Sequence, residues 1–548
     1  MIILAILIIP VAISILTLFG TKKLPRTIDE FFTADGDLDE SSFIDTSVAY
    51  AYQIAAISLF AYWGFEYGFW TIWVPIFWGA GYFLLAYLTK RGYVSKFLIK
   101  NTGDTIHGLL KNHYKVRALG ILAGIASMLG LAGTAFFEAE FTANIAANLL
   151  NSSQTLEGNA DNFSIWIFIS FVVIALMYII IGGQRAIVKT DAVQLRVGFI
   201  SFMFFFGGLI GITHSMGYIY SSTLIFILCL VLIGLLIYVY QRLSKTVLDS
   251  KSYNIIFITG ALLFVTAFVI AANITTQTAK VTTDNFASFW ESNRMSNIFV
   301  LGFPALISLL IANVTWQIVD VSNWQRISSI RNTPDFKKRL QSTLQYVGIY
   351  SPITWVFAIF LGMSIKMLLI NELGGAYNSF SNSLVWLMQS DNVFFNVLPL
   401  IMLICMVLIM FSTLDSLILA ISFTVQKDIF NLDGKRDSNI TRFKMGTIGI
   451  TVALFVFYVF SRTYVTEIDS ILYTFYAFQI GLLPAILFAL TSKSFNKYAA
   501  VSSLIVGIVV PIVVFIVGLS PYDWTALITF FASLITFLIA NRLSIKNQ

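Results

Sequence analysis

Apolar stretches of about twenty residues recur along this whole chain, and a helix of that length crosses the ~30 Å hydrocarbon core of a bilayer. Of the 548 residues, 58% are hydrophobic and only 11% are charged, whereas soluble domains carry about 25% charged residues. The apolar runs are continuous rather than alternating, which excludes an outer-membrane barrel. The sequence therefore predicts an all-α polytopic membrane protein.

Hydropathy predicts about fifteen transmembrane helices, with a bias of positive charge toward one side. The predicted spans are 2–20, 45–66, 68–89, 119–148, 163–182, 191–214, 221–242, 253–273, 296–320, 343–370, 394–425, 441–461, 467–491, 498–518 and 522–541. The first span has no basic segment ahead of it and is followed by Lys22, Lys23 and Arg26, which is typical of a retained span with an outside N-terminus. An odd number of spans then places the C-terminus in the cytoplasm. We expect a multi-pass protein of the plasma (inner) membrane.

Several functional classes are excluded by what the loops contain. The net charge of +6 reflects cytoplasmic loops rather than a nucleic-acid surface. No loop is long enough for a soluble catalytic domain, and no Walker, HExxH or GxSxG motif occurs, so we expect neither an enzyme nor a bound cofactor. Cys229 and Cys405 lie in apolar runs and are interpreted as buried packing residues. His107 and His113 fall in a basic inner loop and are expected at the surface.

A polar patch interrupts the apolar run near 393–425, where the sequence is Phe-Ser-Thr-Leu-Asp-Ser. Polar groups inside a span are costly and usually line a cavity or a site. The hydroxyls of Ser412 and Thr413 are hard ligands suited to Na⁺. Alternatively, they hydrogen-bond the carbonyl four residues earlier in their own helix. Asp415 is open to interpretation as a gating or helix-end carboxylate, and coupling to protons is possible if Asp191 or Asp415 titrates.

Three segments together resemble the sodium:solute symporter family. The stretch 182–194 is similar to the Gly-Gly-x-x-Ala-Val-x-x-Thr-Asp-x-x-Gln signature of that family. The patch at 411–416, followed by Asp-Ile-Phe at 428–430, resembles its Met-Ser-Thr-x-Asp-Ser helix and trailing Asp-Ile-Tyr. Gln325-Arg326 matches a Gln-Arg pair after a span. The segments 29–32 and 62–68 give weaker support, and the resemblance covers about residues 20–500.

The resemblance implies a LeuT-like fold of two inverted five-helix repeats with the binding site at the midplane. The spans 221–242 and 253–273 belong to neither repeat and form an inserted helical hairpin. The predicted units are 1–44, an N-terminal peripheral span with an inner loop; 45–214, repeat one; 215–295, the hairpin and an outer loop; 296–491, repeat two; and 492–548, the C-terminal peripheral spans.

The resemblance also implies a sodium site between the first and eighth core helices. The implied ligands are the carbonyls of Ala49, Tyr52 and Ile409 and the hydroxyls of Ser412 and Thr413. Asp191 is expected to stabilise the cation electrostatically without contacting it. A helical carbonyl is available only where its N–H partner is missing, so the first core helix should be broken near 52–58.

Candidates for the solute site are polar residues in the middle of spans. They are Gln53, Glu138, Asn313, Gln317 and Gln479, and for each the alternative is a helix–helix hydrogen bond. The aligned positions where sugar-transporting members carry polar groups hold Ala51, Ala56, Val74 and Pro75, which argues against a sugar. Should Glu138 or Glu140, which point to different faces, line the cavity, a cationic or amine-bearing solute is favoured.

The predicted function is secondary active transport: Na⁺-coupled symport of a small polar organic solute by alternating access, with Na⁺ as the coupling ion. The expected partners are the solute, Na⁺ and the lipid bilayer, with no nucleic acid. The alternative is a transporter-fold membrane subunit or sensor that binds a ligand or partner without cycling. In that case a protein partner could dock on the hairpin at 221–273.

Overall fold

The protein, in a computed structural model, is built from helices throughout its described part, with one isolated bridge between Leu38 and Ile330. The structure describes residues 8, 11–13, 15–16, 24–94, 105–152, 160–247, 251–274, 297–300, 302–330, 335–372, 380–432, 439–462, 476–492, 496–517 and 522–546. The all-α class predicted from hydropathy is confirmed.

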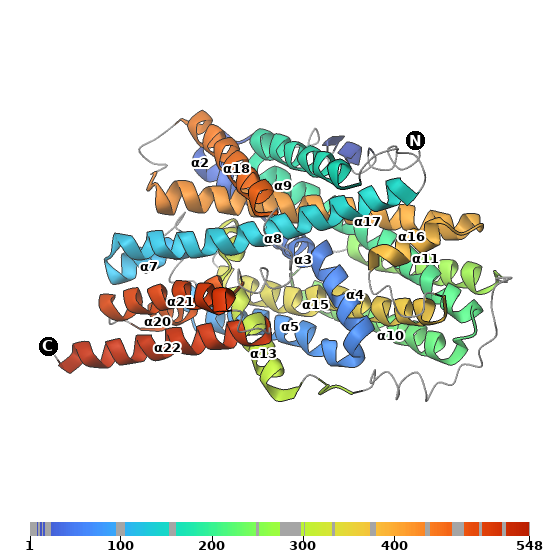
Figure 1. The fold of residues 1–548 in the computed structure, drawn as a ribbon. Coiled ribbons are helices and arrows are strands. Elements are labelled where there is room, and N and C mark those ends of the chain that lie inside the picture. Colours follow the sequence, from blue (N-terminus) through green and yellow to red (C-terminus); the bar gives the residue numbers. More distant parts are fainter. Residues whose placement is uncertain are drawn as a thin grey trace.

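The helices run mostly along one common direction (Figure 1). The first part of the chain forms α2 (Ile28–Thr33), η1 (Ala34–Gly36), α3 (Glu40–Ala51), α4 (Ile54–Tyr67), η2 (Gly68–Ile72), α5 (Trp73–Lys90), α7 (Ile106–Tyr114), α8 (Arg117–Ser152), α9 (Ala160–Ser215), α10 (Ile219–Val247) and α11 (Lys251–Ala272). The second part forms α13 (Gly302–Val319), α14 (Val321–Ser328), α15 (Phe336–Glu372), α16 (Phe380–Met388), α17 (Val393–Thr424), the π-helix η3 (Val425–Ile429), α18 (Ile440–Arg462), α20 (Leu483–Thr491), α21 (Lys497–Val517) and α22 (Tyr522–Lys546).

The described residues contain 11 helical stretches that are long and apolar enough to cross a membrane. Two of these stretches, Ala56–Lys90 and Phe163–Ser215, are 35 and 53 residues long and each combine two predicted spans. The predicted span 2–20 lies largely outside the described residues, and 467–491 is described only from Tyr476 onward. The multi-pass helical architecture is therefore confirmed, whereas the number of fifteen spans and the division into repeats stay predictions.

Glycines bring α15 into backbone contact with the first helices of the bundle. A Cβ added at Gly64 of α4 would lie 2.3 Å from the Ile359 carbonyl oxygen, and one added at Gly362 of α15 would lie 1.8 Å from that of Ala61. Gly79 of α5 would approach the Gly348 carbonyl oxygen in the same way, at 2.5 Å. Small residues at helix interfaces allow such close packing in membranes. These contacts fix α4 and α5 against α15, and all three helices line the cavity described below.

Two of the motif segments and helix α17 meet around the short helix α2. Gly183 bends α9 sharply, with φ 57° and ψ −150°, and a Cβ there would lie 2.5 Å from the Phe31 carbonyl oxygen. The neighbouring carbonyl, that of Phe32, accepts a hydrogen bond from Gln325 Nε2 at 2.7 Å. The Phe32 ring also packs on Phe423 of α17, with 4.9 Å between centroids. Buried contacts with α2 therefore join the turn in α9 to α14 and α17.

The expectation of a surface position is wrong for His107. Its side chain is fully buried, with Nδ1 2.7 Å from Asp428 Oδ2 and Nε2 2.8 Å from Ser127 Oγ. Thr105 donates a further hydrogen bond of 2.6 Å to Asp428. The polar side chains at the start of α7 pack into the junction of α8 and η3. The basic composition of the surrounding loop therefore did not predict that His107 is buried. His113 is half-buried.

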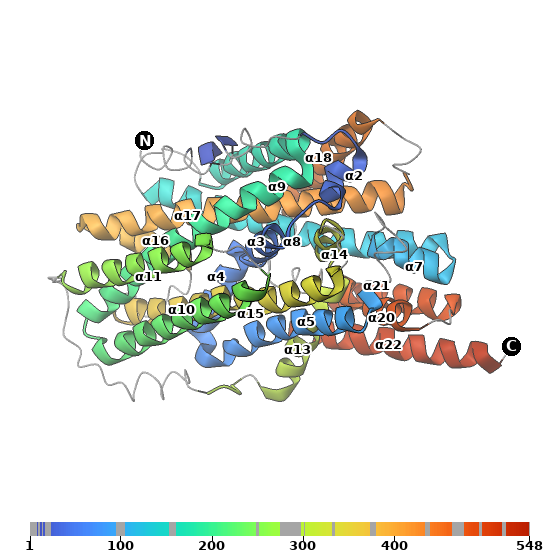
Figure 2. The ribbon, with the colours of Figure 1, turned by 180° about the vertical axis from the view of Figure 1, so that it is seen from behind.

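The hairpin of α10 and α11 runs along one flank of the bundle, where α11 packs against α9 (Figure 2). Gly207 and Gly211 of α9 form the contact: added Cβ atoms would lie 2.2 Å from the Phe264 carbonyl oxygen and 2.5 Å from that of Phe268. The spacing of four residues places both glycines on one helix face. The hairpin is therefore a closely packed part of the bundle.

We predict that Gly207→Ala lowers the free energy of unfolding by about 1–3 kcal/mol, because the new methyl group forces α9 and α11 apart. Gly234→Ala in α10 is the matched control, since no atom lies within 4 Å of a Cβ added there. Both changes improve helix propensity equally. Thermal unfolding of the two purified variants in detergent measures the difference, and equal stability would show that the helices are not in backbone contact.

Candidate functional site

The first core helix is interrupted in the middle of the bundle. Helix α3 ends at Ala51 and α4 begins at Ile54, and Gln53 between them has φ −49° and ψ 133°. The break lies at the start of the range 52–58 expected from sequence. The Ala51 carbonyl accepts a hydrogen bond of 2.8 Å from Trp355 Nε1. The last carbonyls of a helix lack the N–H partner four residues later in their own helix. The Ala49 carbonyl accepts a hydrogen bond of 3.2 Å from the Tyr52 N–H, and a carbonyl that accepts one hydrogen bond keeps a second lone pair for a ligand.

A second break, which the sequence analysis missed, separates α13 from α14. Asp320 has φ −70° and ψ 111°, and its carboxylate accepts hydrogen bonds of 2.9 Å from the backbone N–H and the hydroxyl of Ser322. An Asp at the N-cap of a helix is a recognisable signal in the sequence. The apolar run that continues up to Val319 led instead to the prediction of one span over 296–320.

Asp191 of α9 connects α3 and α17. Its Oδ1 accepts a hydrogen bond of 2.6 Å from the Ser412 hydroxyl of α17, and its Oδ2 accepts one from the Thr46 hydroxyl of α3. All three side chains are at most 1% exposed. The structure thus brings two of the sequence-predicted residues, Asp191 and Ser412, into direct contact, and adds Thr46, which sequence reasoning missed.

The hydroxyl of Thr413 hydrogen-bonds the Ile409 carbonyl of its own helix at 3.2 Å. This is the alternative considered from the sequence, but it leaves cation binding possible. The Ile409 carbonyl lies inside α17, so it accepts this bond beside the helical one from the backbone N–H four residues later, and both its lone pairs are used. Binding of a cation by this carbonyl therefore requires the Thr413 hydroxyl to turn away. The Thr413 hydroxyl itself donates its hydrogen and keeps two lone pairs. The same holds for Ser412, which donates to Asp191. The three oxygens lie on α17, which packs against α3, the helix that carries Ala49.

Arg326 is buried between the two helix breaks. Its guanidinium donates hydrogen bonds of 3.3 Å to Thr46 Oγ1 and 3.2 Å to Ser322 Oγ, and lies 4.1 Å from the centroid of the Tyr50 ring. One positive side chain therefore contacts α3 on one side and the start of α14 on the other. The Gln-Arg motif seen in the sequence supplies this connection and places a positive charge near Asp191 and Asp320.

Asp415 lies one turn after Ser412 on α17 and is fully buried. Its Oδ2 accepts a hydrogen bond of 2.5 Å from the hydroxyl of Tyr178, in the first half of α9. Its Oδ1 makes no hydrogen bond with any residue that the structure describes. Because it lies well inside α17, which continues to Thr424, Asp415 is not a helix-end carboxylate. The gating interpretation stays a prediction.

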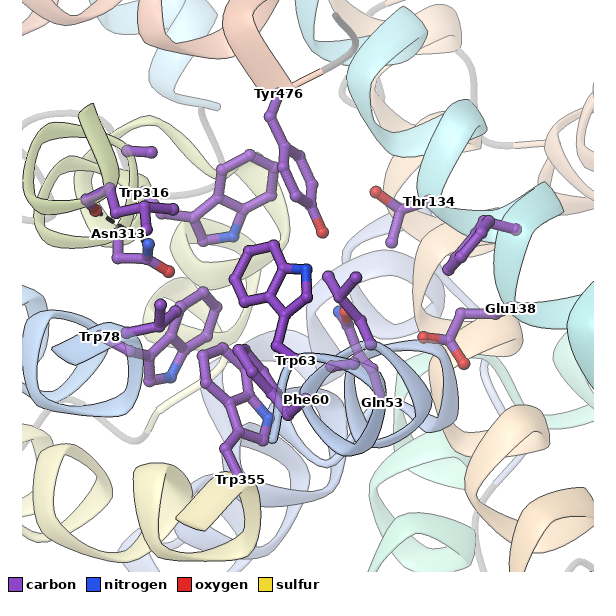
Figure 3. A pocket seen from close by; sticks show the side chains of 16 residues that line it. Gln53, Phe60, Trp63, Trp78, Thr134, Glu138, Asn313, Trp316, Trp355 and Tyr476 are labelled. Atoms are coloured by element: carbon purple, nitrogen blue, oxygen red, sulfur yellow. Dashed lines mark hydrogen bonds between the residues drawn. The ribbon is translucent and has the colours of Figure 1, made fainter. Parts of the chain in front are cut away.

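A cavity of about 70 Å³ lies beside the first break, enclosed by α4, α5, α8, α13 and α15 (Figure 3). Three of the sequence candidates line it: Gln53, Glu138 and Asn313. Ala56 and Val74, which argued against a sugar, line it too. Glu138 is fully buried and its carboxylate points inward from α8 (Figure 3), whereas Glu140 is not among the lining residues.

Two candidates do not line this cavity. Gln317 accepts a hydrogen bond of 2.7 Å from Asn323 Nδ2 across the second break, although Asn313, four residues earlier, does reach the cavity. Gln479 is fully buried against Gly130, where an added Cβ would lie 2.5 Å from its Nε2. For Gln317 the structure shows the helix–helix hydrogen bond that was the alternative interpretation.

The walls of the cavity are mainly aromatic, which sequence reasoning missed. Four tryptophans line it, each from a different helix: Trp63, Trp78, Trp316 and Trp355. Tryptophan is usually enriched at the two interfaces of a bilayer. Trp78 and Trp355 fall in the middle of the predicted spans 68–89 and 343–370, and this was the available signal.

Comparison with known proteins supports the fold. No protein-family model matches the sequence, and no curated protein matches it either. Among solved structures, a Na⁺-coupled sialic acid symporter in a substrate-bound outward-open state matches with a TM-score of 0.65 over 99% of this chain and 98% of that one, at 13% identity. At this identity the likeness shows the fold alone: the chain has a LeuT-like fold.

A second solved structure is Mhp1, a nucleobase-cation-symport-1 family transporter, in a closed conformation with bromovinylhydantoin bound. It matches over 94% of this chain and 95% of that one, with 13% identity and a TM-score of 0.46. This value is too low to contribute to the argument.

We predict that Thr46→Val lowers the free energy of unfolding by about 1–3 kcal/mol, because it removes a hydrogen bond from the buried Asp191 carboxylate at nearly constant volume. Thr190→Val is the matched control. Its hydroxyl bonds only carbonyls of its own helix among the described partners, those of Ala186 and Ile187. Chemical unfolding of both variants tests the network, and an equal loss in the two would contradict it.

Proposed function

We propose that this chain is a secondary active transporter that couples Na⁺ entry to uptake of a small polar organic solute by alternating access. The observation that carries the proposal is the break at Tyr52 and Gln53. Tyr52 is a proposed ion ligand, and the adjacent Gln53 lines the cavity. The proposed ion site and the cavity therefore meet at two consecutive residues of irregular backbone.

The proposed ion ligands are oxygens that carry no net charge. They are the carbonyls of Ala49, Tyr52 and Ile409 and the hydroxyls of Ser412 and Thr413, contributed by α3, its C-terminal end and α17. Hard oxygen ligands suit a hard cation such as Na⁺. Asp191 holds Ser412 by a 2.6 Å hydrogen bond, so its negative charge stabilises the cation from one residue away.

Coupling between ion and solute follows from the two helices that the ion would hold together. A cation bound to both α3 and α17 fixes the end of α3, and thereby the conformation of Gln53 at the cavity. Without the ion, the irregular backbone at 52–53 has fewer partners and the solute site is less ordered. One charge crossing a potential of 100 mV supplies about 2.3 kcal/mol, enough for more than tenfold accumulation of the solute.

The alternative, a subunit or sensor that binds without cycling, makes a different prediction for flux. The interruption between α3 and α4 and the cavity beside it support a transporter. The hairpin packs on α9 through Gly207 and Gly211, so it has a structural role without a docked partner. Purified protein in liposomes separates the two. Uptake driven by an inward Na⁺ gradient supports transport, whereas ligand binding without flux supports the sensor. The cytoplasmic C-terminus and outside N-terminus stay predictions.

We predict that the double substitution Ser412→Ala/Thr413→Ala abolishes stabilisation of the protein by Na⁺ relative to K⁺. Occupancy at about 100 times Kd stabilises a folded protein by about 2.7 kcal/mol, which the double variant should lose. The measurement is the unfolding midpoint across a Na⁺ titration at constant ionic strength.

The matched control is Ser422→Ala, ten residues further along α17, where the hydroxyl is 2.6 Å from Thr447 and outside the proposed site. This variant should keep the Na⁺ response of the unmodified protein. A Na⁺ response retained by the double variant would show that the ligands are assigned to the wrong residues.

A further inference from the structure

Aromatic rings line the cavity in two groups, and the indole of Trp63 lies between them (Figure 3). On one side Trp78, Phe60 and Trp355 pack together, with ring centroids 4.5 Å apart for Trp78 and Trp355 and 4.6 Å apart for Phe60 and Trp355. On the other side Trp316 packs edge-on against Tyr476, with centroids 4.6 Å apart. These rings belong to several different segments of the chain, so the walls are a product of the tertiary fold.

The indole N–H groups of Trp78 and Trp355 donate their hydrogen bonds to atoms outside the cavity lining. Trp78 Nε1 donates a hydrogen bond of 3.2 Å to Ser351, and Trp355 Nε1 donates one of 2.8 Å to the Ala51 carbonyl. Both acceptors lie outside the set of residues that line the cavity. These two tryptophans therefore present ring carbon and π-electron surface to a solute, and no hydrogen-bond donor.

The described residues that line the cavity include an acidic side chain and no basic one. Among the described lining residues Glu138 is the single carboxylate, and none is Lys, Arg or His. Asn313 uses its Nδ2 to bond the Leu309 carbonyl at 2.9 Å, which leaves its Oδ1 toward the cavity (Figure 3). A negative group, a carbonyl oxygen and π-electron faces all favour a positively charged occupant.

The geometry points to a compact alkylated ammonium as the solute, with the methyl groups of its cationic head against the aromatic walls and its charge facing Glu138. This deepens the proposed function, on which it rests for the transport step. Aromatic cages select quaternary ammonium groups because the cation meets ring faces without needing hydrogen bonds. The ring faces offer no acceptor to the three N–H donors of a primary ammonium, so the alkylated head fits the aromatic side of the cavity, while the acceptors Glu138 and Asn313 Oδ1 lie among its polar lining.

Three probes that share a 2-hydroxyethyl group test the proposal by calorimetry on the purified full chain in Na⁺ buffer. They are 2-hydroxyethyltrimethylammonium, its primary counterpart 2-hydroxyethylammonium, and the neutral isostere 3,3-dimethylbutan-1-ol. We expect the trimethylated cation to bind at least about tenfold more tightly than either of the others. Equal binding of the neutral isostere, or tighter binding of the primary ammonium, would overturn the assignment, as would no binding of the trimethylated probe.

Two substitutions assign the binding to this cavity. Glu138→Gln, which is nearly isosteric, should raise Kd for the trimethylated cation about tenfold or more, and leave binding of the neutral isostere unchanged. Glu140→Gln, two residues away and outside the cavity lining, is the control and should leave Kd unchanged. Trp355→Leu should raise Kd about fivefold or more, compared with Trp166→Leu at a side chain that is 66% exposed. Unchanged Kd values in both cavity variants would contradict the proposal.

The result is independent of whether the protein transports. Binding of the trimethylated cation without Na⁺-driven flux in liposomes would support the cage and contradict the proposed function. Na⁺-driven flux or Na⁺ stabilisation that is lost in Ser412→Ala/Thr413→Ala, together with no binding of this cation, would support the function and contradict the cage.

Discussion

The interruption of the first core helix at Tyr52 and Gln53 is the constraint on which the rest of the structure depends. Irregular backbone at membrane depth is tolerated only where protein surrounds it or it lines a cavity. Here both conditions hold: the Ala51 carbonyl accepts a hydrogen bond from Trp355, and Gln53 lines the cavity. The glycine contacts that bring α15 against α4 place Trp355 where it can do this.

The second break, at Asp320, lies on the opposite side of Arg326. The guanidinium contacts Thr46 before the first break and Ser322 after the second, so both interruptions share one buried positive charge. Buried charges are costly unless paired and hydrogen-bonded. The acidic groups around this arginine, Asp320 and Asp191, are themselves hydrogen-bonded to hydroxyls on three helices. A movement of α3 or α14 would have to rearrange this network.

Local properties were predictable from the sequence, and the rotation and packing of helices were not. Hydropathy identified the helical class. The free-carbonyl requirement, applied to the ligands that the family resemblance implies, predicted a break near 52–58, and the break lies at 52–53, at the start of that range. Periodicity put Glu138 and Glu140 on different faces, and only the structure shows which one faces the cavity. The burial of His107, the aromatic walls and the positions of Gln317 and Gln479 depend on contacts between segments far apart in sequence. The ion ligands themselves stay predictions, because the structure shows their neighbourhood and not their occupant.

The central claim is that ion binding orders the break shared by the ion site and the cavity. Hydrogen–deuterium exchange of the segment around residues 49–57 tests it most directly, in Na⁺ and in K⁺ at equal ionic strength, with a segment of α10 as the internal reference. The account predicts slower exchange at the break in Na⁺ and no change in α10. Exchange at the break that is the same in Na⁺ and K⁺ would contradict it.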